Sequence, residues 1–141
     1  MNHQPEIDAQ VVRAFLEASM VPDPETAATY LAAEVSITFT GGRQFARAAD
    51  IAAFNARRYR WVKKRQERTD VASDRDVTVV YNSGTLYGEW PDGTPFEGNR
   101  YIDRFEVRRH KIVKMEVWND SAERLLILHG LGEMRPDPIP E

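Results

Sequence analysis

The sequence predicts one α+β domain in which N-terminal helices cap a curved antiparallel sheet around an apolar pocket. Apolar residues recur at helical spacing in the first part of the chain, and long stretches rich in β-branched and aromatic residues fill the second. Three helices interrupted by one strand, and then a run of strands, is the order expected when helices form one layer and a sheet the other. The length of 141 residues is typical of a single domain.

The chain begins with two predicted helices. Apolar side chains between Ile7 and Ala18 are spaced for one helical face, and the pattern ends at Val21 because a residue before proline avoids the α conformation. Asp23 followed by Pro24 is typical of an N-cap and a first helical position. A short second helix is therefore expected over residues 24–31.

A strand and a third helix follow. Residues 35–39 alternate apolar and polar side chains up to the pair Gly41-Gly42, which predicts a half-buried strand. Residues 48–59 carry apolar side chains at helical spacing and basic ones toward the C-terminal end, where cations suit the helix dipole. Residues 61–72 hold many charges and few apolar side chains, so we expect an exposed strand there.

The remaining chain is predicted to form two hairpins and a helix. Proline and glycine in the segment 91–94 mark a turn, because proline presets φ and glycine supplies a positive φ. The predicted strands cover residues 77–90, 96–107 and 112–119, followed by a helix over 121–128 and a frayed proline-rich end over 135–141.

Composition excludes several classes of protein. Cysteine is absent, which excludes thiol chemistry and Cys-ligated zinc and suits a cytoplasmic protein. No apolar run approaches the roughly 20 residues that span a bilayer, and the N-terminus lacks a secretion signal, so no membrane association is expected. Lysine and arginine concentrate between residues 43 and 114, where we expect them to protect strand edges rather than to bind nucleic acid.

The last two strands carry a family resemblance. Asn99-Arg100-Tyr101 leads into residues 104–108, then Lys111-Ile112-Val113 and Trp118-Asn119-Asp120 follow. With the element order, this resembles the SnoaL-like branch of the nuclear transport factor 2-like (NTF2-like) superfamily over residues 6–130, leaving 131–141 as a C-terminal tail. The resemblance implies a cone-shaped, cystatin-like α+β barrel that pairs as a homodimer through the outer face of its sheet. It also implies a fold that hosts cyclases, isomerases, epoxide hydrolases, dehydratases and proteins without known chemistry, so the fold alone does not give the activity.

Strand register decides which side chains of the last hairpin share a face. We expect a three-residue loop with His110 in the left-handed conformation, because a two-residue loop would place Asp103 opposite Glu116. The predicted register pairs Phe105 with Val113. The expected concave face consists of Tyr101, Phe105, Val113, Met115 and Val117, with Asn99, Asp103 and Asn119 as its polar members. The expected outer face, suited to a dimer, consists of Ile102, Arg104, Ile112, Lys114, Glu116 and Trp118.

Asp103 is the main catalytic candidate. A carboxylate among apolar neighbours loses solvation, so its pKa rises and it becomes suited to exchange protons near neutral pH. The alternative is a structural ion pair with Arg100, Arg104 or a basic residue of the third helix. Asp120 is a second candidate carboxylate, with capping of the following helix as its alternative role.

The other candidate residues are expected to line the pocket, and the histidines are not expected to form a metal or catalytic site. Tyr59 and Trp90 are predicted to line it together with Asn99, Tyr101, Phe105, Met115, Val117 and Asn119. No pair of histidines has metal-ligand spacing, and we expect neither a metal, nor a His–carboxylate dyad, nor a cofactor.

Two functions remain open. The resemblance argues against a polyketide cyclase or an epoxide hydrolase of the usual kind, because Glu116-Val117 and Phe105 replace the cyclase acid–base residues and Arg100 and Asp103 point to opposite faces. The first hypothesis is a small-molecule-binding protein for an apolar, ketone-like ligand, which is either non-catalytic or performs isomerase, cyclase or dehydratase-type proton transfer. The second is a non-catalytic dimeric protein-interaction module.

Overall fold

The computed structural model describes residues 4–133. In chain order its elements are α1 (Gln4–Met20), α2 (Pro24–Ala28), β1 (Leu31–Phe39), a 3₁₀ turn (Thr40–Gly42), β2 (Arg43–Phe45), α3 (Ala48–Arg58), β3 (Trp61–Asp74), β4 (Val77–Glu89), β5 (Pro95–Arg108), β6 (Lys111–Asn119) and α4 (Ser121–Leu128). One of the three histidines, His3, and most of the expected tail over 131–141 lie outside the described residues.

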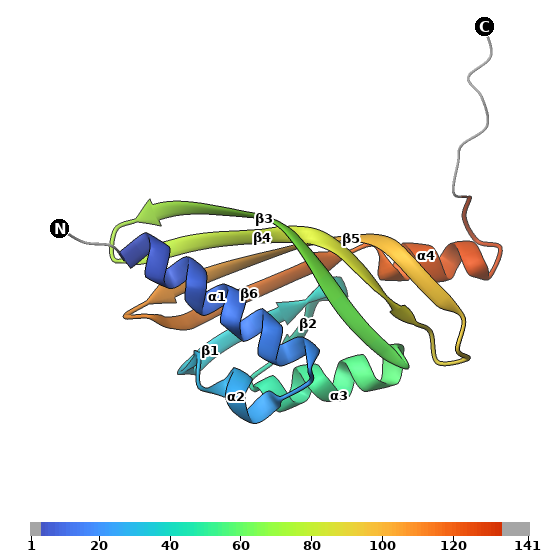
Figure 1. Cartoon of the computed structure of the whole chain (residues 1–141), viewed down its shortest axis with the longest axis horizontal. Helices are drawn as coiled ribbons and strands as arrows, with labels where there is room; N and C mark the ends of the chain where they lie inside the picture. The colour runs from blue at the N-terminus through green and yellow to red at the C-terminus, as the bar shows by residue number, and fades with distance from the viewer. Residues whose placement is uncertain (1–3, 134–141) are drawn as a thin grey trace, which may run out of the picture.

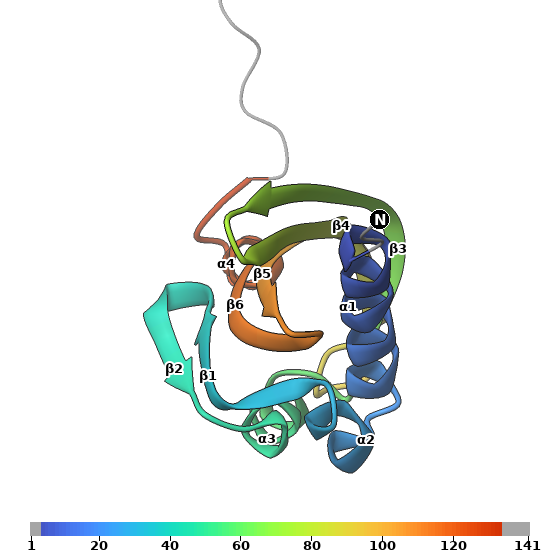
Figure 2. The ribbon, with the colours of Figure 1, turned by 90° about the vertical axis from the view of Figure 1, so that its left-hand side faces the viewer.

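The predicted α+β fold is confirmed. Six strands form one sheet in the order β2-β1-β6-β5-β4-β3, and this sheet curls into an open trough (Figures 1 and 2). The sheet is mixed rather than wholly antiparallel, because β1 runs parallel to β6. Figure 2 shows that the sheet does not close on itself and that α1, α2 and α3 cover its open side.

The core lies between α1 and the concave face of the sheet. Val12, Phe15 and Leu16 of α1 are fully or almost fully buried, as their helical spacing predicts. Phe15 meets Phe105 of β5 edge to face, with ring centroids 6.0 Å apart. Alternate residues of the strands therefore complete the core, and their polar members are carried inside with them.

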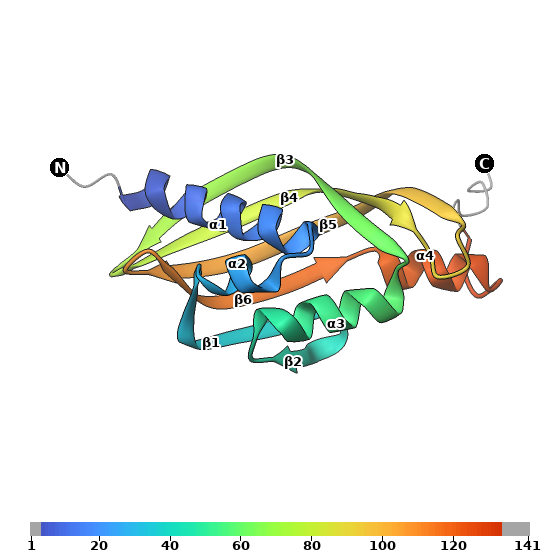
Figure 3. The same cartoon turned by 60° about the horizontal axis from the view of Figure 1, so that its bottom comes forward.

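Two glycines let β3 approach β4 closely. A Cβ atom at Gly84 would lie 1.9 Å from the carbonyl oxygen of Arg65, and one at Gly88 would lie 2.2 Å from that of Trp61. Only glycine fits at such distances. The register of β3 against β4 also shifts between Gln66 and Arg68, and β3 bends across the length of the sheet (Figure 3).

The last hairpin differs from its predicted register by two residues. Its loop contains two residues, Arg109 and His110, which both have positive φ. Phe105 faces Met115 instead of Val113, and Val113 is the extra residue of a β-bulge between the paired positions Ile112 and Lys114.

The shift by an even number leaves most of the predicted faces unchanged. Asp103 faces Val117 and Ile102 faces Trp118, each on the side that was expected. The exception is the bulge itself. Ile112, expected on the outer face, is fully buried in the core, whereas Val113, expected on the concave face, is only partly buried.

Two shorter elements also differ from expectation. The second helix ends at Ala28, and Leu31 already belongs to β1. The short strand β2, which was not predicted, pairs with the end of β1. None of the four α-helices described within residues 4–133 has the length and apolar character that a membrane-spanning helix requires.

Candidate functional site

A buried ion pair lies inside the trough. Asp103 of β5 is fully buried, and its Oδ2 accepts a hydrogen bond from Nζ of Lys64 on β3. The Lys64 side chain is 9% exposed, so water barely screens the pair. The second carboxylate oxygen, Oδ1, is buried without a hydrogen-bond partner.

Burial raises the pKa of Asp103, and the neighbouring Lys64 opposes this rise only in part. The ion-pair partner of Asp103 is therefore Lys64 and not one of the arginines that the sequence suggests. Arg100 and Arg104 point to the outer face, where they pair with Asp120 and Glu116 respectively.

A chain of contacts between polar side chains continues from this pair across the strands. Nζ of Lys64 lies 4.3 Å from the ring centroid of Tyr101, as in a cation–π contact. The Tyr101 hydroxyl donates to Oδ1 of Asn82 at 2.6 Å, and the Asn82 amide donates to Gln66 at 3.0 Å. Burial raises the pKa of Tyr101 above its usual range. Tyr101 is thus a neutral hydrogen-bond donor that is already engaged within the protein.

A small cavity adjoins the ion pair. It measures about 30 Å³, roughly the room for one water molecule, and Lys64, Tyr59, Met115, Val117 and Asn119 are among its lining residues. We call it the interior cavity. Lys64 lines it whereas Asp103, behind Lys64, does not.

A cleft of about 140 Å³ leads toward the interior cavity from outside. It lies between the end of α1, α3 and the beginning of β3, and we call it the entrance cleft. Both spaces share the lining residues Ser19, Met20, Asn55, Tyr59 and Val62. Movement of these side chains, of which Met20 is the most adaptable, would join the two spaces.

A second buried cluster lies near Tyr59. The Tyr59 hydroxyl and Oγ of Ser121 are 2.6 Å apart, and the Asn99 amide donates to the same Oγ at 3.3 Å. Oδ1 of Asn99 is buried without a partner. Burial raises the pKa of Tyr59, so its hydroxyl stays neutral.

The predicted lining residues therefore separate into four groups. Tyr59, Met115, Val117 and Asn119 meet around the interior cavity. Phe105 is part of the core against α1, and Tyr101 and Asn99 belong to the buried polar clusters. Trp90 is buried against Phe96, with ring centroids 4.4 Å apart, and lines a different and larger cleft.

Asp120 does not belong to the interior. Its carboxylate forms an ion pair with Arg100 at 2.7 Å on the outer side of the sheet, and this arginine lowers the pKa of Asp120. Asp120 stands at the N-cap position of α4, but its side chain accepts no capping hydrogen bond. Oδ1 of Asn119 instead accepts from the Ser121 amide at 3.1 Å.

A His–carboxylate pair exists, contrary to the sequence-based expectation. Nδ1 of His110, in the β5–β6 turn, lies 3.0 Å from Oδ1 of Asp8 on α1. Asp8 is fully buried, whereas the His110 side chain is half exposed. The two residues are 102 positions apart, so only the folded chain brings them together.

Sequence reasoning missed Lys64, Asn82 and Ser121. A signal for Lys64 was present, because Val62, Lys64 and Gln66 alternate along β3 and share one face. The high charge of that strand favoured the interpretation of an exposed strand. Across residues 4–133, no three histidine, aspartate or glutamate side chains gather in a way that could hold a metal ion.

The fold resembles several solved structures. An NTF2-like protein from Burkholderia thailandensis is 20% identical, covers 89% of this chain and 98% of its own, and has a TM-score of 0.69. A putative SnoaL-like polyketide cyclase from Jannaschia sp. is 15% identical, with 96% and 98% of the two chains covered and a TM-score of 0.67. TerC, co-crystallised with polyporic acid, is 16% identical, with 89% and 97% covered and a TM-score of 0.67.

No protein-family model and no curated protein sequence matches the chain. The likeness to these solved structures nevertheless covers most of this chain and almost the full length of each compared chain. It confirms the resemblance to the SnoaL-like branch at the level of architecture. The chain therefore has an NTF2-like fold.

Proposed function

We propose that the protein binds a small, largely apolar molecule with a ketone-like oxygen in the interior of the trough. The observation that carries this proposal is the buried Lys64–Asp103 pair beside a cavity whose other walls are mainly apolar. A charged donor in apolar surroundings is the usual way in which a pocket orients a single polar atom of its ligand. The solved structure of TerC with polyporic acid is support from a similar fold.

The size of the spaces limits the ligand. The entrance cleft and the interior cavity measure about 140 and 30 Å³, so the ligand has one or two rings rather than a large polycyclic skeleton. Met20 and Val62 line both spaces and would have to move as it enters. Lys64 donates a hydrogen bond to its oxygen, because Lys64 is the charged residue that reaches the cavity.

The reaction that suits this pair is proton transfer next to the ketone. The carbon–hydrogen bond breaks, the proton passes to the unpartnered Oδ1 of Asp103, and the electron pair moves onto the ligand oxygen, where the Lys64 ammonium stabilises it. The proton then returns to the same carbon or to a neighbouring one. Since Asp103 lies behind Lys64, the ligand reaches it only when the flexible Lys64 side chain turns away from Asp103 while its ammonium stays on the ligand oxygen.

Binding is tested with 1-indanone as the probe. We expect it to raise the melting temperature of the wild-type protein and to have no effect on Lys64→Met, which removes the charged donor from the cavity. Lys114→Met is the matched control, because Lys114 lies on the outer face of β6, and it should respond like the wild type. No response of the wild-type protein, or an equal response of all three proteins, would contradict the proposal.

Catalysis is tested by proton exchange. In D₂O the protein should accelerate the replacement of the C2 hydrogens of 1-indanone, which NMR follows directly. Asp103→Asn should bind the ketone and lose the acceleration. If the wild-type protein binds the ketone but does not accelerate the exchange, the proposed proton transfer is contradicted and only the proposed binding remains.

A second candidate function, a dimeric protein-interaction module, rests on the outer face of the sheet. Ile102 and Trp118 pair directly across β5 and β6, and they are 43% and 48% exposed. Paired apolar side chains of this size are typical of interface centres. We propose that this face joins two copies of the chain, an arrangement compatible with either function.

A further inference from the structure

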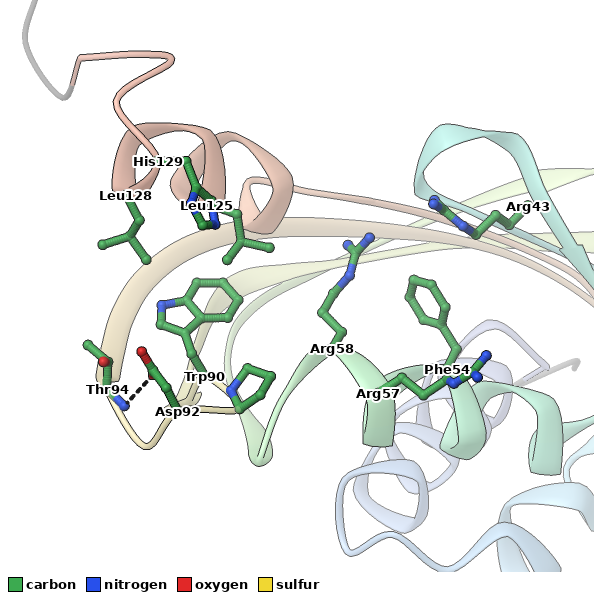
Figure 4. Close-up of a pocket in the computed structure, with 11 residues that line it drawn as sticks. Arg43, Phe54, Arg57, Arg58, Trp90, Asp92, Thr94, Leu125, Leu128 and His129 are labelled. Carbon is green, nitrogen blue, oxygen red and sulfur yellow. Dashed lines mark hydrogen bonds between the residues drawn. The ribbon is translucent and has the colours of Figure 1, made fainter.

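A large open cleft lies at the end of the trough near α4. Its volume is about 770 Å³, within the range of small-molecule sites, and it is framed by α3, the residues around β2, the β4–β5 turn and α4 (Figure 4). We call it the arginine cleft and define it by Arg43, Phe54, Arg57, Arg58, Trp90 and Leu125. It shares no lining residue with the entrance cleft or the interior cavity.

The arginines of this cleft lack carboxylate partners. Within residues 4–133 no acidic side chain forms an ion pair with Arg43, Arg57 or Arg58, although arginines elsewhere, such as Arg100 and Arg104, are paired in this way. Nη1 of Arg58 is buried and has no hydrogen-bond partner. A buried donor without a partner costs free energy, and a ligand acceptor would remove that cost.

The one carboxylate that lines the cleft does not neutralise these arginines. Asp92 accepts a hydrogen bond from the backbone amide of Thr94 at 2.9 Å within its own turn, and Thr94 lowers the pKa of Asp92 (Figure 4). Three arginines against one aspartate leave the cleft positively charged. It therefore favours an anion.

Aromatic and aliphatic side chains give the cleft apolar walls. Two guanidinium groups lie near the Phe54 ring, with Cζ of Arg58 at 4.7 Å and Cζ of Arg43 at 5.4 Å from its centroid. Figure 4 shows Arg58 extending from α3 into the space between Phe54 and Trp90, with Leu125 above Trp90. A flat apolar ligand would find ring surfaces and a leucine beside the charged groups.

We infer that the arginine cleft binds a small aromatic carboxylate. Its carboxylate accepts a hydrogen bond from the unpartnered Nη1 of Arg58 and, once the exposed Arg57 side chain turns toward it, a second one from Arg57. Its ring packs against Trp90 and Leu125. This site is separate from the interior one, and the inference stands without the proposed function.

The test uses 2-naphthoate, with binding measured by isothermal titration calorimetry at fixed ionic strength. We expect Arg57→Gln and Arg58→Gln each to weaken binding by about tenfold or more, the loss typical of one hydrogen bond to a charged group. Arg13→Gln is the matched control, because Arg13 is an exposed arginine of α1 outside the cleft, and its affinity should equal that of the wild type. Arg57 is itself exposed, so its replacement should leave the fold intact.

Two further measurements distinguish binding in the arginine cleft from binding elsewhere on the protein. The neutral analogue 2-naphthamide should bind much more weakly than 2-naphthoate, and the double variant Lys64→Met/Asp103→Leu, which removes the interior ion pair without leaving a single buried charge, should bind 2-naphthoate like the wild type. Equal binding of the two probes would overturn the inference, as would an absence of binding. Loss of binding in Lys64→Met/Asp103→Leu with retention in Arg57→Gln would place the ligand in the interior and would also overturn the inference.

Discussion

The Lys64–Asp103 pair is the residue-level feature with the largest expected effect on stability. Lys64→Met leaves a buried carboxylate without its counter-charge, and Asp103→Leu leaves a buried ammonium, so each single replacement should cost about 3–5 kcal/mol. The double variant has neither charge and should recover most of that loss. Urea denaturation measures the three free energies of unfolding, and a double variant as unstable as the sum of both singles would show that the charges do not compensate each other.

Asp103 should also impose a pH dependence on stability. Its pKa is raised in the folded protein, whereas an unfolded aspartate titrates near pH 4. Between the two pKa values the folded state holds the extra proton, so the free energy of unfolding falls as the pH rises through that window. Asp103→Asn removes the titration. The wild type should therefore lose stability relative to Asp103→Asn as the pH rises above 4, and a constant difference between their unfolding free energies would contradict the raised pKa.

Residue-level prediction from the sequence succeeded where the information was local. The alternation along β5 was enough to place Asp103 among apolar neighbours, and the structure buries it fully. Its partner Lys64 lies 39 positions earlier on a strand whose charges resemble a solvent-exposed face. The contact of Asp8 with His110 could not be predicted for the same reason, because the residues near each of them in sequence give no indication of the other. Contacts of this kind depend on how the strands cross.

At the level of elements, the β5–β6 hairpin shows how a prediction can have the right faces and the wrong register. If the strands had no bulge, a two-residue loop would place Asp103 opposite Glu116. This like-charge contact made the two-residue loop an unfavourable prediction. The protein has that loop and avoids the clash through the bulge at Val113, which restores the alternation of the following residues. Bulges of this type leave little trace in sequence, so the pairing could not be deduced from alternation alone.

The two loop residues of this hairpin should respond oppositely to substitution. Both have positive φ, the conformation of a type I′ turn that asparagine and glycine adopt more easily than arginine or histidine. Arg109→Asn should therefore stabilise the protein by about 0.5–1 kcal/mol. His110→Gly relieves the same strain but leaves the buried Asp8 without its partner, so it should destabilise by about 1–3 kcal/mol. Urea denaturation measures the free energy of unfolding of each variant. An equal gain in stability from both would mean that the Asp8–His110 contact contributes nothing to stability.

At the scale of the whole molecule, the open trough separates three surfaces with different chemistry. The concave side holds the ion pair, the end near α4 holds the arginine cleft, and the convex side of β5 and β6 exposes Ile102 and Trp118. The sequence placed Asp103 on the concave face and Ile102 and Trp118 on the outer face, because strand alternation assigns side chains to faces, but it did not identify Lys64 as the partner of Asp103. It did not predict the second, because the cleft is assembled from four segments that meet only in the folded chain.

The convex side leads to a prediction about assembly. If two copies pair through Ile102 and Trp118, a lysine at position 118 places two charges at the centre of the interface and should convert a dimer into a monomer. Size-exclusion chromatography with light scattering measures the mass of the wild type and of Trp118→Lys. Val71→Lys, on the edge strand β3, is the matched control, because Val71 is 41% exposed but belongs to another part of the sheet. A monomeric wild type would refute the dimer outright, and a dimer that survives Trp118→Lys would have to use a different surface.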